Sequence, residues 1–152
     1  IIYSGRDDGL HQQGVGMLIS TEAKKALLGY DTVGPRIIKA RFKTTHGKAT
    51  VIQVYAPTAD CADSVIDEFY ALLQQTVNNT SNTDLMVIMG DFNAKVGTDW
   101  KTWKGAIGKF GHGEENERGE RLLQFCLNNN LKIMNTVFYQ RLRNRQIEKH
   151  IT

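Results

Sequence analysis

The sequence has few of the features that would tie it to a secreted or membrane setting. It contains two cysteines, Cys61 and Cys126, which are too few for a disulfide framework. No apolar run approaches the roughly 18 residues that a membrane-spanning helix needs. The N-terminus also lacks the basic-then-apolar pattern of a signal peptide. These absences favour an intracellular protein with no membrane partner. Cys126 lies in an apolar helical pattern, so we expect it to be a buried free thiol.

Length and composition fit one folded domain. The chain has 152 residues, of which 41% are hydrophobic and 23% are charged, and these values exclude a disordered tail. There is no initiator methionine, because the chain opens on Ile1-Ile2-Tyr3 as though cut within a strand. We therefore expect residues 1–152 to be a single domain taken from a longer protein.

The basic residues are concentrated near the C-terminus. The formal net charge is +3, and the segment from Arg141 to Lys149 carries all of it, since the basic and acidic residues elsewhere balance. Arg141, Arg143 and Arg145 would share one face of an extended segment, because strand side chains alternate. Such a row could lie along a phosphate backbone. The alternative is a solvated edge strand that is protected by its charges.

Apolar patterns predict strands interrupted by two helices, which is an α/β architecture. Strands are expected at residues 14–20, 35–43, 49–55, 85–90 and 131–135, with another beginning in 138–145, and residues 46–48 form a hairpin turn. The strands at 49–55 and 85–90 read as buried. Residues 105–119 read as a glycine-rich loop.

The two helices are expected at residues 60–78 and 116–128. The first should be capped by Asp60 or Asp63. Its apolar stripe consists of Val65, Phe69, Leu72, Leu73 and Val77. In the second, the inward residues are Leu122, Leu123, Cys126 and Leu127.

The segment Gly90-Asp91-Phe92-Asn93 follows the predicted strand at 85–90. A strand that ends in Gly-Asp delivers its carboxylate to the rim of a sheet, where ligands bind in α/β proteins. Asp91 and Asn93 are two residues apart, so their side chains point the same way. A carboxylate beside an amide suits a divalent metal ion and a phosphate. The alternative is an ordinary Asx turn that closes the strand.

Tyr55 ends the other buried strand and is followed by Ala56-Pro57. Its phenol could lie at the same rim and donate a hydrogen bond to a phosphate oxygen. The alternative is a core tyrosine that bonds a backbone carbonyl. Because both motifs end strands of what should be one sheet, we expect Tyr55, Asp91 and Asn93 to converge.

Taken together, these motifs resemble the endonuclease/exonuclease/phosphatase superfamily. The order is strand-Tyr55-Ala56-Pro57, a helix, then strand-Gly90-Asp91-Phe92-Asn93-Ala94. The stretches "YSGRDDGLHQQGVG", "GDFNAKVG" and "GKFGHGEENERGERLLQFC" are similar to the endonuclease domain of non-LTR retrotransposons, and most similar to the RTE type. The resemblance covers essentially the whole chain.

The resemblance implies a partial four-layer α/β/β/α sandwich of the DNase I-like type. It also implies a Mg²⁺-dependent DNA endonuclease, with Mn²⁺ as an alternative ion, that nicks DNA to prime reverse transcription. Asp91 would orient or deprotonate the attacking water and contact the metal, and Asn93 would hold that water or the phosphate. Tyr55 would stabilise charge on the phosphate oxygens. Asn116 would contact the substrate. The arginine row, judged from its own spacing and charge, is a further candidate for contact with DNA.

Several motifs of the resembled family are absent from this chain. The family has an asparagine and a glutamate near its N-terminus, and an aspartate and a Ser-Asp-His triplet near its C-terminus. We therefore expect a domain truncated at both ends, which does not nick DNA alone. The implied partners are DNA and the reverse transcriptase region of the same polyprotein, in the nucleus. The alternatives are a phosphatase acting on inositol or lipid phosphates, and a degenerate structural module.

Overall fold

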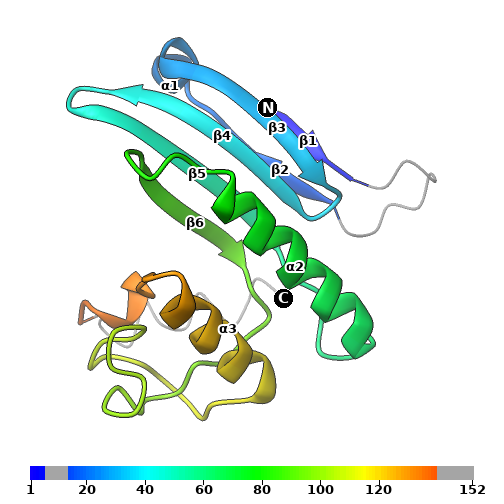
Figure 1. Ribbon diagram of the computed structural model, residues 1–152, viewed down its shortest axis with the longest axis vertical. Coiled ribbons are helices and arrows are strands. Elements are labelled where there is room, and N and C mark those ends of the chain that lie inside the picture. Colours follow the sequence, from blue (N-terminus) through cyan, green and yellow to red (C-terminus); the bar gives the residue numbers. More distant parts are fainter. Residues whose placement is uncertain (6–13, 140–152) are drawn as a thin grey trace. The chain divides into compact units, whose positions relative to one another are not determined.

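The computed structural model describes residues 1–5 and 14–139 (Figure 1). The chain forms two compact units, Ile1–Asn93 and Ala94–Thr152. The expected single domain over residues 1–152 stays a prediction. The residues Tyr55, Asp91 and Asn93 all belong to the first unit, so this unit positions the predicted site.

A four-stranded sheet forms the centre of the first unit (Figure 1). Its strands lie in the order β3 (Leu27–Gly34), β4 (Ile37–Thr44), β5 (Gly47–Tyr55) and β6 (Leu85–Asp91). The first three are antiparallel neighbours, and β4 reaches β5 through the predicted tight turn, which lies at residues 45 and 46. Strand β6 is parallel to β5. A parallel pair requires a crossover connection, and helix α2 (Asp63–Asn78) supplies it.

A second, two-stranded sheet pairs β1 (Ile2–Ser4) with β2 (Val15–Met17). Its buried residues form one apolar cluster with Ile38 and Ala40 of β4, and the partly buried Tyr55 packs against that cluster. Helix α2 contacts the opposite face of the large sheet, where Leu72 lies against Gly34 and helps to line a hollow with Lys39. The first unit thus has the layers helix, sheet and sheet, which confirms the predicted α/β class.

The predicted buried face of α2 is partly wrong. Phe69 and Leu73 are buried as expected, but the other buried side chains are those of Ile66, Tyr70 and Thr76. The predicted stripe therefore needs to be rotated around the helix axis. The predicted cap is also wrong, because the N-cap is Ala62, which makes no side-chain cap bond, and Asp63 is already within the first turn.

Helix α1 (Thr21–Ala26) and strand β3 of the first unit were not predicted. The six-residue helix α1 starts after Ser20, whose hydroxyl accepts a hydrogen bond from the Ala23 N–H. Strand β3 follows it directly. The sequence of β3, "LLGYDTVG", has no regular apolar alternation, because it is an edge strand with mostly exposed or half-buried side chains.

The expected burial of β6 is wrong. Leu85 is 68% exposed, and Val87 and Met89 are also exposed. All three project on the face that bears Val51 and Tyr55, since paired residues of parallel strands share a face. The two-stranded sheet packs on β4 and β5 and does not reach β6, which lies at the edge of the large sheet. The apolar side chains of β6 on this face are therefore left exposed.

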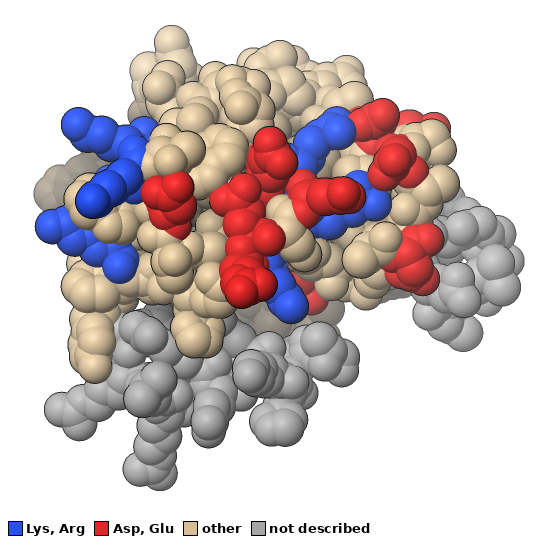
Figure 2. All heavy atoms as spheres, turned by 90° about the horizontal axis from the view of Figure 1, so that it is seen from below, with Lys and Arg blue, Asp and Glu red and all other residues tan. Residues whose placement is uncertain are grey.

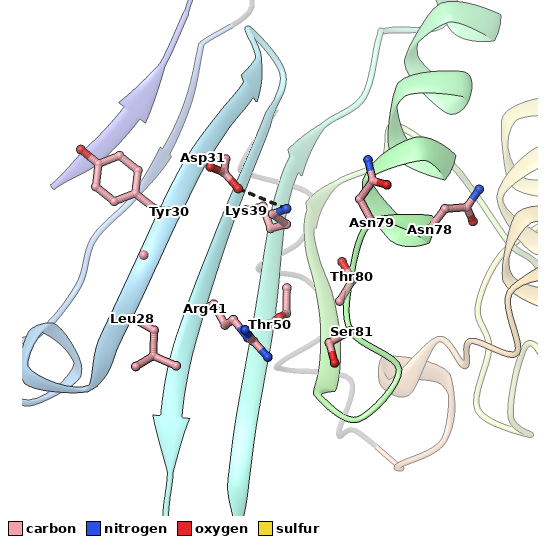
Figure 3. A pocket seen from close by; sticks show the side chains of 11 residues that line it. Leu28, Tyr30, Asp31, Lys39, Arg41, Thr50, Asn78, Asn79, Thr80 and Ser81 are labelled. Carbon is pink, nitrogen blue, oxygen red and sulfur yellow. Dashed lines mark ion pairs between the residues drawn. The ribbon is translucent and has the colours of Figure 1, made fainter.

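A hollow of about 610 Å³ lies on the α2 side of the sheet (Figure 3). Its lining includes Arg41, whose guanidinium donates two hydrogen bonds to Asp84, at 2.6 and 2.8 Å. The buried Thr50 hydroxyl donates to the same carboxylate. Figure 3 also shows Lys39 paired with Asp31, at 3.1 Å. Both cations of the lining are therefore neutralised by carboxylates.

The second unit is built around helix α3 (Glu117–Asn128). The predicted residues Leu122, Leu123 and Cys126 are buried in it, while Leu127 is half-buried and Phe125 is buried instead. Cys126 is a free thiol, as expected, and burial raises its pKa to about 11.

The predicted strand at residues 131–135 is wrong. The Ile133 N–H donates to the Ala106 carbonyl of the preceding loop, at 2.8 Å. The chain then turns into a short 3₁₀ helix, Met134–Thr136. Among the described residues, this segment therefore bonds to a loop and to its own turn, and it belongs to neither sheet. The strand expected within 138–145 lies largely outside the described residues.

Candidate active site

Tyr55 and Asp91 are direct neighbours at the ends of β5 and β6. They are Cα partners in the last register position of this parallel pair. Since paired residues of parallel strands project on the same face, the phenol and the carboxylate share one face of the sheet. The Ala56 N–H continues the ladder by donating to the Asp91 carbonyl, at 2.8 Å. The structure thus brings these two predicted site residues together.

Gly90 allows this close pairing. Its φ of +136° is one that residues with a side chain rarely adopt, and a Cβ added there would lie 1.9 Å from the Val54 carbonyl oxygen. The glycine therefore lets β6 approach β5 one residue before Asp91. This close approach is to the protein's own backbone.

The segment after Asp91 is an Asx turn. The Asn93 N–H donates to Oδ1 of Asp91, at 2.8 Å, and Asn93 has a φ of +47°. The turn that sequence reasoning treated as the alternative is therefore present. It does not exclude a functional role, because the same turn fixes the orientation of the Asp91 carboxylate, which stays exposed.

Asn93 is also tied to the end of β5. Its side-chain Nδ2 donates to the Ala56 carbonyl, at 2.8 Å. This bond uses the amide nitrogen, so the orientation leaves Oδ1 as the acceptor that can face water. The tyrosine, the carboxylate and the amide thus belong to one hydrogen-bonded rim, from Tyr55-Ala56 to Asp91 and Asn93.

Arg36 is a member of this rim that the sequence analysis missed. It lies in the turn that precedes β4, and its carbonyl accepts a hydrogen bond from the Tyr55 N–H, at 3.0 Å. Its guanidinium donates to the Tyr55 carbonyl, at 3.2 Å, and lies over the Tyr55 ring, at 5.4 Å from the centroid. The available signal was the hairpin register, which places the residue before Ile37 opposite the residue after Val54.

Asn116 belongs to the second unit and acts there as a helix cap. Its Oδ1 accepts hydrogen bonds from the Gly119 N–H at 2.8 Å and from the Lys95 N–H at 3.0 Å. Its predicted contact with a substrate stays a prediction. The predicted row Arg141, Arg143 and Arg145 lies outside the described residues.

The rim has the chemistry to contribute part of a magnesium site. Asp91 offers a carboxylate and Asn93 an amide oxygen, and Mg²⁺ is commonly held by one or two carboxylates together with waters and phosphate oxygens. Within residues 1–5 and 14–139, no three histidine, cysteine, aspartate or glutamate side chains are grouped to hold a metal. The donor pair of Asp91 and Asn93 suits an ion whose other ligands are water and phosphate oxygens.

Charge on the described surface is mixed. Figure 2 shows lysine and arginine side chains grouped at the left of the view, aspartate and glutamate side chains grouped near its centre, and both kinds together on the right. No helix among these residues is both long enough and apolar enough to cross a membrane.

Comparison with known proteins gives the class to which this rim belongs. Residues 49–151, which include the whole rim except Arg36, match the family described as Endonuclease-reverse transcriptase. The chain belongs to this family, and the resemblance to the endonuclease/exonuclease/phosphatase superfamily is confirmed.

Two curated relatives extend the similarity over nearly the whole chain. Craniofacial development protein 2 of Bos taurus is 39% identical over 140 residues, which cover 92% of this chain and 23% of the relative. The protein of the same name from Tragulus javanicus is 38% identical over 140 residues and 24% of its length. The chain thus spans about a quarter of the relatives it matches.

A solved structure is also similar. The endonuclease domain of TRAS1, a telomere-specific non-LTR retrotransposon, aligns with 68% of this chain and 41% of its own, at 17% identity and a TM-score of 0.49.

Proposed function

We propose that this chain contributes the Tyr55–Asp91–Asn93 part of the active site of a DNA endonuclease that hydrolyses one phosphodiester bond and leaves a nick. The observation that supports the proposal most is the register of β5 and β6, which pairs Tyr55 with Asp91 on one face. The family description, which joins an endonuclease to a reverse transcriptase, supports DNA as the substrate. It also supports a reverse transcriptase region as partner. In our proposal the whole is a retroelement protein that acts in the nucleus, where its DNA substrate lies.

The three side chains divide the work of hydrolysis. Asp91 accepts a proton from a water molecule while that water forms a new bond to phosphorus. Asn93 holds the water or a phosphate oxygen through its amide. The Tyr55 hydroxyl donates to a non-bridging oxygen as charge grows there and the bond to the leaving sugar oxygen breaks. Mg²⁺, when bound, would neutralise charge on the phosphate oxygens, and Asp91 with Asn93 would contribute to holding it.

Nicking of supercoiled plasmid by the full-length protein tests the proposal. We expect open circles in Mg²⁺ or Mn²⁺, none with EDTA, and a loss of at least about 100-fold in Asp91→Ala, in line with removal of a general base. Asp31→Ala is the matched control, because it removes an exposed carboxylate from β3. Nicking that survives Asp91→Ala would contradict the proposal. Phosphate release from an inositol or lipid phosphate, without nicking, would favour a phosphatase of the same superfamily.

A further inference from the structure

Arg36 and Tyr55 make three separate contacts at the end of β5. The Arg36 carbonyl accepts from the Tyr55 N–H, and the Arg36 guanidinium donates to the Tyr55 carbonyl. The same guanidinium lies over the phenol ring. The guanidinium therefore adds a side-chain bond to the pairing of these two backbones, and Arg36 contacts both the backbone and the ring of Tyr55.

The ring of Tyr55 contacts an apolar cluster and the guanidinium of Arg36. It is half-buried and packs against the apolar cluster of the two-stranded sheet. The guanidinium lies near it at cation–π distance. A phenol that pivots on its Cβ would carry its hydroxyl through several ångströms, and small misplacements of a catalytic donor cost large factors in rate. The Arg36 guanidinium contacts both the Tyr55 ring and the Tyr55 carbonyl, and both contacts oppose this pivoting.

We infer that Arg36 is a positioning residue, which holds the Tyr55 hydroxyl where it can donate to the phosphate oxygen. The inference rests on the proposed function, since it assigns Arg36 a role at the same site. A lysine could not fully replace Arg36, because only a planar guanidinium can stack on the ring and bond the carbonyl at once. Arg36 then acts through Tyr55 and affects the chemical step more than DNA affinity.

A double-mutant cycle in the full-length protein tests this inference. In the nicking assay, Arg36→Met should lower kcat by about tenfold with little change in KM, the signature of an interaction made mainly in the transition state. The same substitution in a Tyr55→Phe background should cost almost nothing further, because the hydroxyl that it positions is already absent. Arg36→Lys should recover only part of the loss.

Lys39→Met is the control for charge, because Lys39 is a cation of the following strand, β4, and lines the hollow on the α2 side. It should leave nicking unchanged. Thermal unfolding of Arg36→Met and Arg36→Lys shows whether either loss of nicking activity results from a destabilised fold. If the fold-losses in kcat of Arg36→Met and Tyr55→Phe multiply in the double variant, Arg36 does not act through Tyr55 and the inference is overturned. A rise in KM and in its salt dependence for Arg36→Met would also overturn it, because Arg36 would then act on DNA binding. A wild-type protein that does not nick overturns the proposed function as well.

Discussion

Gly90 is the residue on which the geometry of the rim depends. Gly90→Ala would force a side chain into a positive φ and against the Val54 carbonyl. We expect a loss of about 2 kcal/mol or more in the free energy of unfolding, from backbone strain together with the clash. Gly29→Ala is the matched control, since a Cβ at this strand glycine meets nothing within 4 Å. Urea unfolding of both variants measures the difference, and equal losses would contradict the role of Gly90.

Asp84 gives the fold a dependence on acid pH. The Arg41 guanidinium, with help from the Thr50 hydroxyl, lowers the pKa of the Asp84 carboxyl to about 2. A group whose pKa is lower in the folded state contributes stability above its unfolded value of 3.8, and that contribution is lost as the pH falls toward 2. The carboxylate side chain is 1% exposed, so its partners leave it little contact with water.

We therefore expect Asp84→Asn to lower the melting temperature by several degrees at pH 7, because Arg41 loses its charged partner. The difference from wild type should shrink as the pH falls from about 4 to 2, where the wild-type carboxylate becomes protonated. Asp31→Asn, at an ion pair whose acid is 64% exposed, should change little at any pH. A constant difference between pH 5 and pH 2 would show that the charge of Asp84 is not what stabilises the fold.

At the scale of elements, Asn116 caps helix α3 and is also predicted to contact the substrate, and two substitutions separate these roles. Asn116→Ala should destabilise the helix by about 1 kcal/mol, because the Gly119 N–H loses its acceptor. Asn116→Asp keeps an oxygen acceptor at the cap and should retain the stability. Thermal unfolding measures both variants. If Asn116 also contacts the substrate, the aspartate variant should nick more slowly while its stability is normal.

The elements nearest the site were the ones that the sequence predicted best. Strand β5 and the Gly-Asp end of β6 have continuous apolar runs followed by clear breaks, so their pairing could be anticipated. Strand β3 could not, because an exposed edge strand needs no regular apolar face. Arg36 escaped for another reason. Its contact with Tyr55 joins residues 19 positions apart, and only the hairpin register brings them together.

At the scale of the whole molecule, the net charge of +3 is the property most relevant to DNA. We expect alanine substitution of Arg141, Arg143 and Arg145 to weaken duplex binding. The slope of log affinity against log salt should fall by about 0.9 for each arginine that contacts a phosphate. Substitution of Lys24, Lys25 and Lys43 removes the same charge elsewhere and is the control. Fluorescence anisotropy between 50 and 200 mM salt, a range of about fourfold, measures both slopes. If the arginine variant and the lysine variant have equal slopes, the arginines do not contact phosphates, and the solvated-edge alternative holds.

The exposed face of β6 has a consequence for handling the protein. Its segment "LMVIMG" has no charge and no proline, and Leu85, Val87 and Met89 present an apolar row at the edge of the described sheet. Such a strand is a template on which a second chain can add by backbone hydrogen bonding. Concentrated preparations of the 152-residue chain should therefore self-associate through this strand, and a charge placed on its outer face would be the simplest way to keep the protein in solution.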